Sequence, residues 1–452
     1  MEGHMNPRKS FIFFLFFSVF LFSSGLFAQR TGYSNEEFIQ RRDALMEEVK
    51  EGLIILFGKA SPTPGQHFRQ DNDFYYFTGV EEVNAVVIMI PRTKRCFLFL
   101  PQQTSREILF EGANLLKHPD KAKKQMGFTD IYPVTYVDEF IARYAPRSGF
   151  VFYARLQPRD LVDNARWENR IFVGRKNRLH YNDQVTLDNY RIKKLQERYP
   201  VVEFRDITPI IDSMRLIKSQ EEIEILRRIG KISAEGVKQA MLASHPGAYE
   251  YEVEAAAMYV VLKNGARNFA YPPIVGSGPN SCIMHYNKNE RQLKDGDILL
   301  MDFGGELDYM CMDISRTWPI NGKFTPEQRE AYEISLEVQK ACIEAYKPGV
   351  TTEDVQKHVK EVMEKKGLDP RGLRGGIGHY VGMATHDVGP RVPLKEGMVF
   401  AIEPGLYYPE KELGIRIEDT VLITKDGCEV LSKDVPKEIH EIEELMKKRK
   451  IK

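Results

Sequence analysis

The sequence predicts an α+β protein in which a mixed α/β N-terminal domain precedes a larger C-terminal domain. Two observations predict this class. Stretches with apolar residues at helical spacing alternate with short, nearly continuous apolar runs that are typical of buried strands. The chain also has 452 residues, which is long enough for two domains, and it shows no internal repeat of solenoid period.

The N-terminal domain is assigned to residues 29–212. Ser34 followed by Glu37 has the pattern of a capping box, and Phe38, Leu45 and Val49 predict a helix that ends near residue 52. Apolar runs bounded by turn-forming or charged residues then predict the strands of a buried sheet, at residues 53–57, 85–90, 96–100 and 150–153.

The C-terminal domain is assigned to residues 213–452. Ser219 and Glu222 form a second predicted capping box, and the residues after them have helical periodicity. Further helices are expected at residues 250–263, 326–346, 352–366 and 437–448. Strands are expected at residues 298–302, 310–318, 398–403 and 415–424.

The composition excludes some functions. Lys and Arg together number 64, as do Asp and Glu, so no overall field favours nucleic acid, and none is expected as a partner. We expect the basic tail 447–450 to be a solvated helix end. The cysteines are odd in number and too widely spaced for a zinc knuckle, and the sequence leaves their disulfide state open: Cys96, Cys282, Cys311, Cys342 and Cys428.

The N-terminus has the pattern of a secretory signal peptide. Arg8 and Lys9 precede an apolar run at residues 11–22, and three small residues at 23–25 follow it before the sequence Leu-Phe-Ala that ends at Ala28. We therefore expect residues 1–28 to be removed, which would leave a secreted or periplasmic protein without stable membrane association. An uncleaved membrane anchor is the alternative, because Leu26 is larger than the residue usually found three positions before a cleavage site.

Two aspartates indicate a metal site. Asp302 ends an apolar run, and Asp313 follows eleven residues later. A hairpin centred between Leu307 and Asp308 would place the two side chains opposite each other, with Cβ atoms about 5 Å apart. Such a pair repels unless a cation lies between the carboxylates. The alternative is that one aspartate makes a turn or an ion pair.

Three further residues favour the metal interpretation. His379 lies in a glycine-rich segment, Glu403 ends an apolar run before Pro404, and Glu418 shares a strand face with Arg416. His379 and Glu418 each have a simpler interpretation, as a core histidine and as a surface ion pair with Arg416. Together, four carboxylates and one imidazole suit a pair of manganese, cobalt or zinc ions better than calcium.

Several segments resemble the pita-bread metallopeptidases, and most closely aminopeptidase P and prolidase. In the C-terminal domain they are IVGSGPNSCIMHY (274–286), MDFG (301–304), MDISRTWPINGKF (312–324), GHYVGMATHDVG (378–389), IEPGLYY (402–408) and GIRIEDTVLIT (414–424). FRQDNDFYYFTG (68–79) resembles the N-terminal domain of the same enzymes. The resemblance implies a pita-bread catalytic domain and covers nearly all of the chain after residue 28.

The resemblance implies five metal ligands: Asp302, Asp313, His379, Glu403 and Glu418. Asp313 and Glu418 would bridge two divalent ions, with manganese the first expectation and cobalt or zinc the alternatives. Glu403 would also act as general base.

The resemblance also implies roles around the ligands. His285 and His386 match histidines that stabilise the tetrahedral intermediate and position substrate, and Arg416 matches an arginine that braces a ligand carboxylate. Tyr407 matches a tyrosine of the substrate site. Gly375 departs from the family pattern, since many relatives have histidine at this position, and the departure puts contacts on the proline side in doubt.

The implied activity is that of an aminopeptidase that cleaves peptides with proline at the second position, using a hydroxide held by two metal ions. Prolidase activity on Xaa-Pro dipeptides is the alternative, because the metal ligands do not separate the two. A catalytically inactive peptide-binding scaffold is a further alternative, although all five ligand positions are filled. The resemblance also implies a homo-oligomer, expected to be a dimer.

Overall fold

The structure is a computed structural model that describes residues 32–60, 67–145, 150–156, 187–368, 373–374 and 376–449. The chain from Gly32 onward forms one compact unit. The predicted signal peptide and Gly375 lie outside the described residues, so both expectations stay predictions. Among the helices that the structure describes, none combines the length and the apolar character needed to cross a bilayer.

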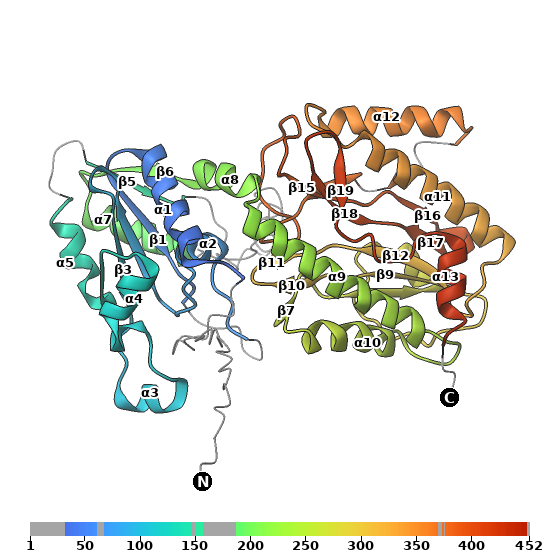
Figure 1. The fold of residues 1–452 in the computed structure, drawn as a ribbon, viewed down its shortest axis with the longest axis horizontal. Helices are drawn as coiled ribbons and strands as arrows, with labels where there is room; N and C mark the ends of the chain where they lie inside the picture. Colours follow the sequence, from blue (N-terminus) through green and yellow to red (C-terminus); the bar gives the residue numbers. More distant parts are fainter. Residues whose placement is uncertain are drawn as a thin grey trace, which may run out of the picture. The chain divides into compact units, whose positions relative to one another are not determined.

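The N-terminal half is built on a six-stranded mixed sheet with the order β4-β3-β2-β1-β5-β6 (Figure 1). Its strands are β1 (Leu53–Phe57), β2 (Val86–Ile90), β3 (Arg95–Leu100), β4 (Asp130–Pro133), β5 (Val151–Ala154) and β6 (Glu203–Asp206). The four predicted strands are confirmed as β1, β2, β3 and β5. The edge strands β4 and β6 were not predicted, because they are short and each contains charged residues.

Helices accompany this sheet, at α1 (Asn35–Val49), α2 (Asn72–Thr78), α3 (Ser105–Glu111), α4 (Pro119–Met126), α5 (Val137–Ala142), α7 (Leu187–Arg198) and α8 (Thr208–Leu216). Ser34 caps α1 as predicted, with its hydroxyl accepting the Glu37 N–H at 3.2 Å. The second hydrogen bond of the predicted capping box, from the Ser34 N–H to the Glu37 carboxylate, is wrong. The Glu37 carboxylate binds Arg41 at 3.0 Å, and the backbone N–H of Ser34 donates to Glu221 instead.

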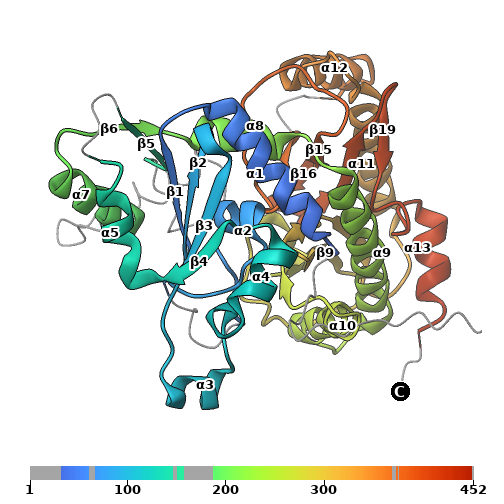
Figure 2. The ribbon, with the colours of Figure 1, turned by 60° about the vertical axis from the view of Figure 1, so that its left-hand side comes forward.

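The C-terminal half has helices α9 (Gln220–Ala243), α10 (Glu250–Lys263), α11 (Pro326–Ala345), α12 (Thr352–Lys365) and α13 (Ile439–Met446) (Figures 1 and 2). The capping box of Ser219 and Glu222 at the start of α9 is confirmed in both arms. One apolar core joins α11 and α12 to the strands beneath them, through Val338, Val355 and Phe400 among others.

The strands of this half form four small sheets, ordered β11-β10-β7, β12-β9-β8, β13-β16-β17 and β14-β15-β18-β19. Their bounds are β7 (Asn268–Phe269), β8 (Ile274–Ser277), β9 (Ile298–Asp302), β10 (Gly305–Leu307), β11 (Met310–Cys311), β12 (Ser315–Pro319), β13 (Leu373–Arg374), β14 (Gly378–Tyr380), β15 (Val399–Ile402), β16 (Gly405–Tyr408), β17 (Leu413–Arg416), β18 (Asp419–Ile423) and β19 (Cys428–Val430).

The predicted hairpin between Asp302 and Asp313 exists, but its predicted register is wrong. Asp308 and Tyr309, with φ of 47° and 71°, form its two-residue turn, and the strands therefore pair Asp302 with Ser315. The ladder is also interrupted between β11 and β12, so the single strand expected at residues 310–318 is two strands. The strand expected at residues 415–424 divides in the same way into β17 and β18.

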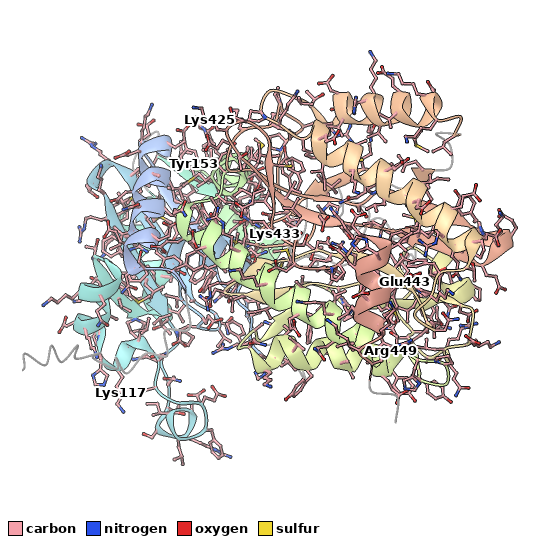
Figure 3. The ribbon with its side chains drawn as sticks, turned by 45° about the vertical axis from the view of Figure 1, so that its right-hand side comes forward. Lys117, Tyr153, Lys425, Lys433, Glu443 and Arg449 are labelled. Atoms are coloured by element: carbon pink, nitrogen blue, oxygen red, sulfur yellow. The ribbon has the colours of Figure 1, made fainter. Side chains whose placement is uncertain are left out.

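The C-terminal helix α13 is held by Glu443 within it and by Arg449 after its last residue, both labelled in Figure 3. Glu443 accepts from Arg329 at 2.8 Å, and Arg449 donates to the carbonyls of Ser244 and Ile320, each at 2.7 Å. The expectation that the basic tail is only a solvated helix end is therefore wrong for Arg449, because its long-range backbone contacts cannot be read from a run of charges.

Candidate metal centre

Four of the five predicted ligands lie where a strand of the C-terminal half ends or where the ladder is interrupted, and His379 lies within a short strand. Asp302 ends β9, and His379 lies in β14. Asp313 lies in the gap between β11 and β12, Glu403 between β15 and β16, and Glu418 between β17 and β18. Successive side chains in a regular strand point to opposite faces of the sheet, but this constraint is lost where the ladder is interrupted. Side chains from separate segments can therefore point toward the same site.

The structure brings these side chains together. Ligand atoms of Asp313, His379 and Glu418 all lie within 4.8 Å of one another. The Nε2 atom of His379 lies 3.4 Å from Glu403 Oε1 and 3.5 Å from Asp313 Oδ2. Asp302 joins the cluster through the Tyr271 hydroxyl, which contacts both Asp302 and Asp313.

The imidazole of His379 is oriented by backbone. Its Nδ1 lies 3.1 Å from the carbonyl oxygen of Tyr380, so an Nδ1–H donor there leaves the Nε2 lone pair facing the carboxylates. Burial, with a further contribution from His386, lowers the pKa of His379 to about 3. The ring is therefore neutral at physiological pH, which is the form that binds metal.

The carboxylates carry more negative charge than a buried site tolerates alone. Burial raises the pKa of Asp313 and of Glu418 well above the usual range, and the neighbouring carboxylates raise both further. Asp313 and Glu418 are 4% and 1% exposed. Unpaired carboxylates at this depth are strongly destabilising, and divalent cations at this point would offset the repulsion. The donor set therefore fits a metal centre.

Arg416 organises one side of the cluster. Its Nη2 donates to Asp302 Oδ2 at 2.6 Å. Its Nε donates to the Ser315 hydroxyl, which in turn donates to Glu418 Oε2 at 2.6 Å. Its Nη1 donates to the hydroxyl of the buried Tyr407 at 3.1 Å, so Tyr407 orients Arg416 directly.

Sequence reasoning missed Tyr271. Its hydroxyl lies 2.6 Å from Asp313 Oδ1 and also contacts Asp302, and burial together with these carboxylates raises its pKa well above the usual range. The protonated hydroxyl has one hydrogen and can donate to one carboxylate at a time. No local pattern marks this residue, since it lies between Ala270 and two prolines, outside any regular strand or helix.

Ser315 and Thr420 were also missed. The Thr420 hydroxyl donates to the Asp313 carbonyl at 2.7 Å and accepts the Asp313 N–H at 3.1 Å, which fixes the backbone of a predicted ligand. Alternation along the predicted strand would have placed Thr420 on one face with Arg416 and Glu418, and it was the available signal, although the strand is divided between Arg416 and Asp419.

The remaining predicted site residues lie at different depths. The ring of His386 is half-buried, with its centroid 4.0 Å from that of His379. His285 is exposed in the segment after the 3₁₀ turn Gly278–Cys282. The structure does not test the roles predicted for these two histidines or for the other site residues.

A cavity of about 530 Å³ adjoins the cluster, because Tyr271 is part of its wall. The wall also includes Lys59, His67, Arg69 and Arg267, so both halves of the chain contribute to it. The two arginines are paired, Arg69 with Glu306 at 2.6 Å and Arg267 with Glu81 at 3.4 Å. The space is large enough for a short peptide beside the carboxylates.

Comparison with known proteins agrees with this geometry. The model of metallopeptidase family M24 matches residues 224–425, and that of the aminopeptidase P N-terminal domain matches residues 38–152. The chain is 34% identical to the Xaa-Pro aminopeptidase of Escherichia coli, over 91% of this chain and 98% of that protein. It is 31% identical to the mitochondrial intermediate cleaving peptidase 55 of Arabidopsis thaliana, over 92% of this chain and 83% of that protein.

Comparison with solved structures also matches the chain to aminopeptidase P. The zinc-substituted aminopeptidase P of Escherichia coli in complex with product superposes with a TM-score of 0.77 at 30% identity, covering 93% of this chain and all of that one. The fold and the site thus define a metal-dependent peptidase with a pita-bread catalytic domain. The chain belongs to metallopeptidase family M24, in its aminopeptidase P branch.

Replacement of His386 is expected to lower the rate of catalysis without loss of bound metal. His386→Ala is expected to lower kcat by roughly 10²-fold, as is typical when a hydrogen-bond donor to a developing oxyanion is removed. Metal content should stay at the wild-type level, because the predicted ligands are intact. Steady-state kinetics and metal analysis of the same preparation check this, and loss of the bound metal would make His386 a ligand.

Proposed function

We propose that the protein is an aminopeptidase that releases the N-terminal residue from peptides with proline at the second position, using two divalent metal ions, with manganese the preferred ion. The observation that carries the proposal is the buried cluster of carboxylates around His379 Nε2. The Escherichia coli relative, named for Xaa-Pro cleavage and matched over nearly its whole length, supports the substrate class.

Bound divalent ions would acidify a water molecule and polarise the scissile carbonyl. Glu403 is suited to proton transfer, because its side chain is 24% exposed and burial raises its carboxyl pKa above the usual value. It would accept the proton of the attacking water and pass it to the proline nitrogen. His386, stacked edge-on against His379, would donate to the oxygen that becomes negative.

Two other substrate classes have their own support. Prolidase activity uses the same ligands and differs in how the cleft limits peptide length. The Arabidopsis relative is named for cleaving intermediates, and its name mentions no proline, which makes cleavage without a requirement for proline a second candidate. An inactive scaffold has less support, because all five predicted ligand positions converge.

We also propose, from the sequence pattern of residues 1–28, that the protein acts outside the cytoplasm as a secreted or periplasmic enzyme. Its partners are peptides, and its assembly is a homodimer. Fractionation of cells that produce the full chain, with N-terminal sequencing of the recovered protein, tests the proposed location. The expected result is a soluble protein cleaved after Ala28, and a protein retained in the membrane is the contrary result.

The activity is tested on the chain from Gln29 onward, with manganese, on Ala-Pro-Ala, Ala-Pro and Ala-Ala-Ala in parallel. We expect chelator-sensitive release of alanine mainly from Ala-Pro-Ala. Cleavage confined to Ala-Pro would indicate a prolidase, and equal cleavage of Ala-Ala-Ala would indicate an aminopeptidase that does not require proline. No cleavage of any peptide by metal-loaded protein would favour the scaffold.

A further inference from the structure

A chain of buried ion pairs links the N-terminal half to the loop at residues 381–388, which carries His386. Arg215, near the end of α8, lies between Asp73 of α2 and Asp387 of that loop. Its Nη1 donates to Asp73 Oδ1 at 2.6 Å, and its Nη2 donates to Asp387 Oδ1. All three side chains are at most 2% exposed.

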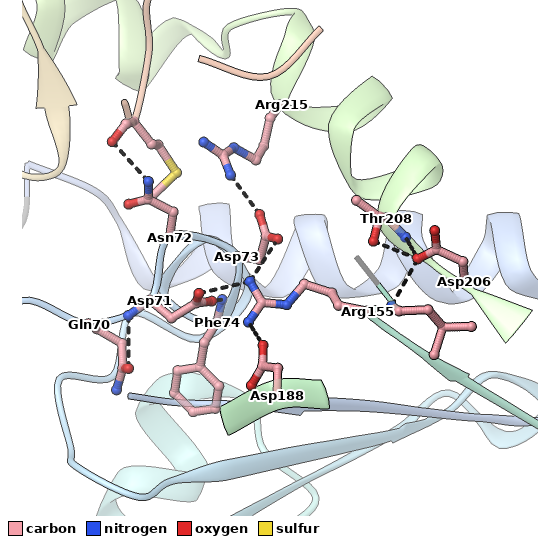
Figure 4. Close-up of polar contacts among 12 residues, drawn as sticks. Gln70, Asp71, Asn72, Asp73, Phe74, Arg155, Asp188, Asp206, Thr208 and Arg215 are labelled. Atoms are coloured by element: carbon pink, nitrogen blue, oxygen red, sulfur yellow. Dashed lines mark hydrogen bonds and ion pairs between the residues drawn. The ribbon is translucent and has the colours of Figure 1, made fainter. Parts of the chain in front are cut away.

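The N-terminal end of this chain is fixed by a second arginine. Figure 4 shows Asp73 between Arg215 and Arg155, whose Nη1 donates to Asp73 Oδ2 at 3.2 Å and to Asp71 Oδ2 at 2.8 Å. Asp71 also caps α2 by accepting the Phe74 N–H at 2.9 Å. Asp73 is thus held at the start of a short, capped helix and has little freedom to follow a moving partner.

The loop is held at further points close to the same pairs. Lys218 Nζ lies 3.4 Å from Asp387 Oδ2. Asn72 and Arg69, both from the N-terminal half, donate to the carbonyl of Met383 at 3.1 and 2.9 Å. Gly382 packs directly on the Asp387 carboxylate, where a Cβ atom would lie 2.0 Å from Oδ2. The loop backbone is therefore packed directly against the ion pairs at Gly382 and hydrogen-bonded at Met383.

The other end of the chain lies at a predicted metal ligand. The backbone N–H of Asp387 donates to the Tyr380 carbonyl at 2.9 Å, and the same carbonyl faces His379 Nδ1 at 3.1 Å. The residue before Asp387 is His386, whose ring lies against that of His379. The position of Asp387 thus bears on the Tyr380 carbonyl that orients His379 and on the backbone that carries His386.

We propose that Asp73, Arg215 and Asp387 form a positioning relay, through which the N-terminal half sets the orientation of His386 and His379. The relay acts on the reaction of the proposed aminopeptidase and rests on that function for its effect on turnover. Misplacement of a reacting group by about 1 Å can cost on the order of 10²-fold in rate, so fixing this loop has a catalytic consequence beyond stability.

Asp387→Asn tests the relay, since it keeps the shape of the side chain and removes its charge. We expect kcat to fall roughly 10- to 100-fold, as for outer partners that orient metal-binding histidines, with a smaller change in KM. We also expect the visible absorption bands of the cobalt-loaded protein to shift, because His379 is less well oriented. Asp73→Asn should reproduce both effects, and the double variant should add little to either single one.

The matched control is Glu222→Gln. Glu222 forms another buried ion pair between the two halves, with Arg41 at 3.1 Å, and its hydrogen bonds are with Ser219, outside the 381–388 loop. This variant should lose thermal stability while keeping wild-type kcat and the wild-type cobalt spectrum. If Asp387→Asn behaves like Glu222→Gln in all three measurements, the relay is merely structural and the proposal is overturned.

Two further outcomes are covered. Should Asp387→Asn fail to fold, Arg215→Lys and Asp73→Asn are measured in the same way, and wild-type kcat and spectrum in both would overturn the relay. Should the wild-type protein cleave no Xaa-Pro peptide, the proposed function fails separately. The cobalt spectrum and cobalt affinity of the variants then decide whether the relay orients His379.

Discussion

Asp313→Asn is expected to abolish peptidase activity. Asp313 belongs to the buried cluster, with Oδ2 3.5 Å from His379 Nε2, and it is the proposed bridge between two ions. We expect kcat/KM to fall by more than roughly 10³-fold, beyond the 10–100-fold typical of outer partners of a metal site. Both ions should also bind more weakly, which metal titration of the apoprotein measures.

The control for this variant is Asp426→Asn, which makes the same chemical change at an exposed position after β18. It should leave activity and metal content unchanged. Wild-type activity in Asp313→Asn would contradict the assignment of Asp313 as a ligand of two ions.

Glu403→Gln is expected to have an effect of similar size for a different reason. The amide keeps the size of the side chain but cannot accept the proton of the attacking water, so kcat should fall by about 10²- to 10⁴-fold. Asp313, Glu418 and His379 remain in place, and at least one ion should therefore stay bound. Single-turnover hydrolysis of Ala-Pro-Ala, together with metal analysis, measures both quantities.

The control is Glu410→Gln, which makes the same chemical change at an exposed position in the turn Pro409–Lys411. It should leave kcat and metal content at the wild-type level. If Glu403→Gln loses all metal and activity together, Glu403 is mainly a ligand. If it keeps both at the wild-type level, the role of Glu403 as base is refuted.

The parts of the fold that local sequence determines were predictable. Nearly continuous apolar runs correctly located β1, β2, β3 and β5, and the paired capping residues Ser219 and Glu222 located the start of α9. Both signals depend on residues only a few positions apart. The edge strands β4 and β6 carry too little apolar character to give such a signal.

Register and long-range contacts were not predictable in this way. The hairpin after β9 was expected to turn one residue too early, because the left-handed φ of Asp308 and Tyr309 is not evident from their residue types. Charge and strand patterns already singled out the five residues of the cluster, and the resemblance implied that they are ligands, whereas Tyr271 had no local signal. Arg215 contacts residues 142 and 172 positions away, a relation that spacing within a segment cannot reveal.

The central claim is that this buried cluster acts through two metal ions. The most direct measurement is titration of the metal-free chain from Gln29 onward with manganese, following bound metal and hydrolysis of Ala-Pro-Ala together. We predict no activity without metal and recovery that saturates at about two ions per chain, as in other two-metal hydrolases. Undiminished hydrolysis by the metal-free protein would contradict the account.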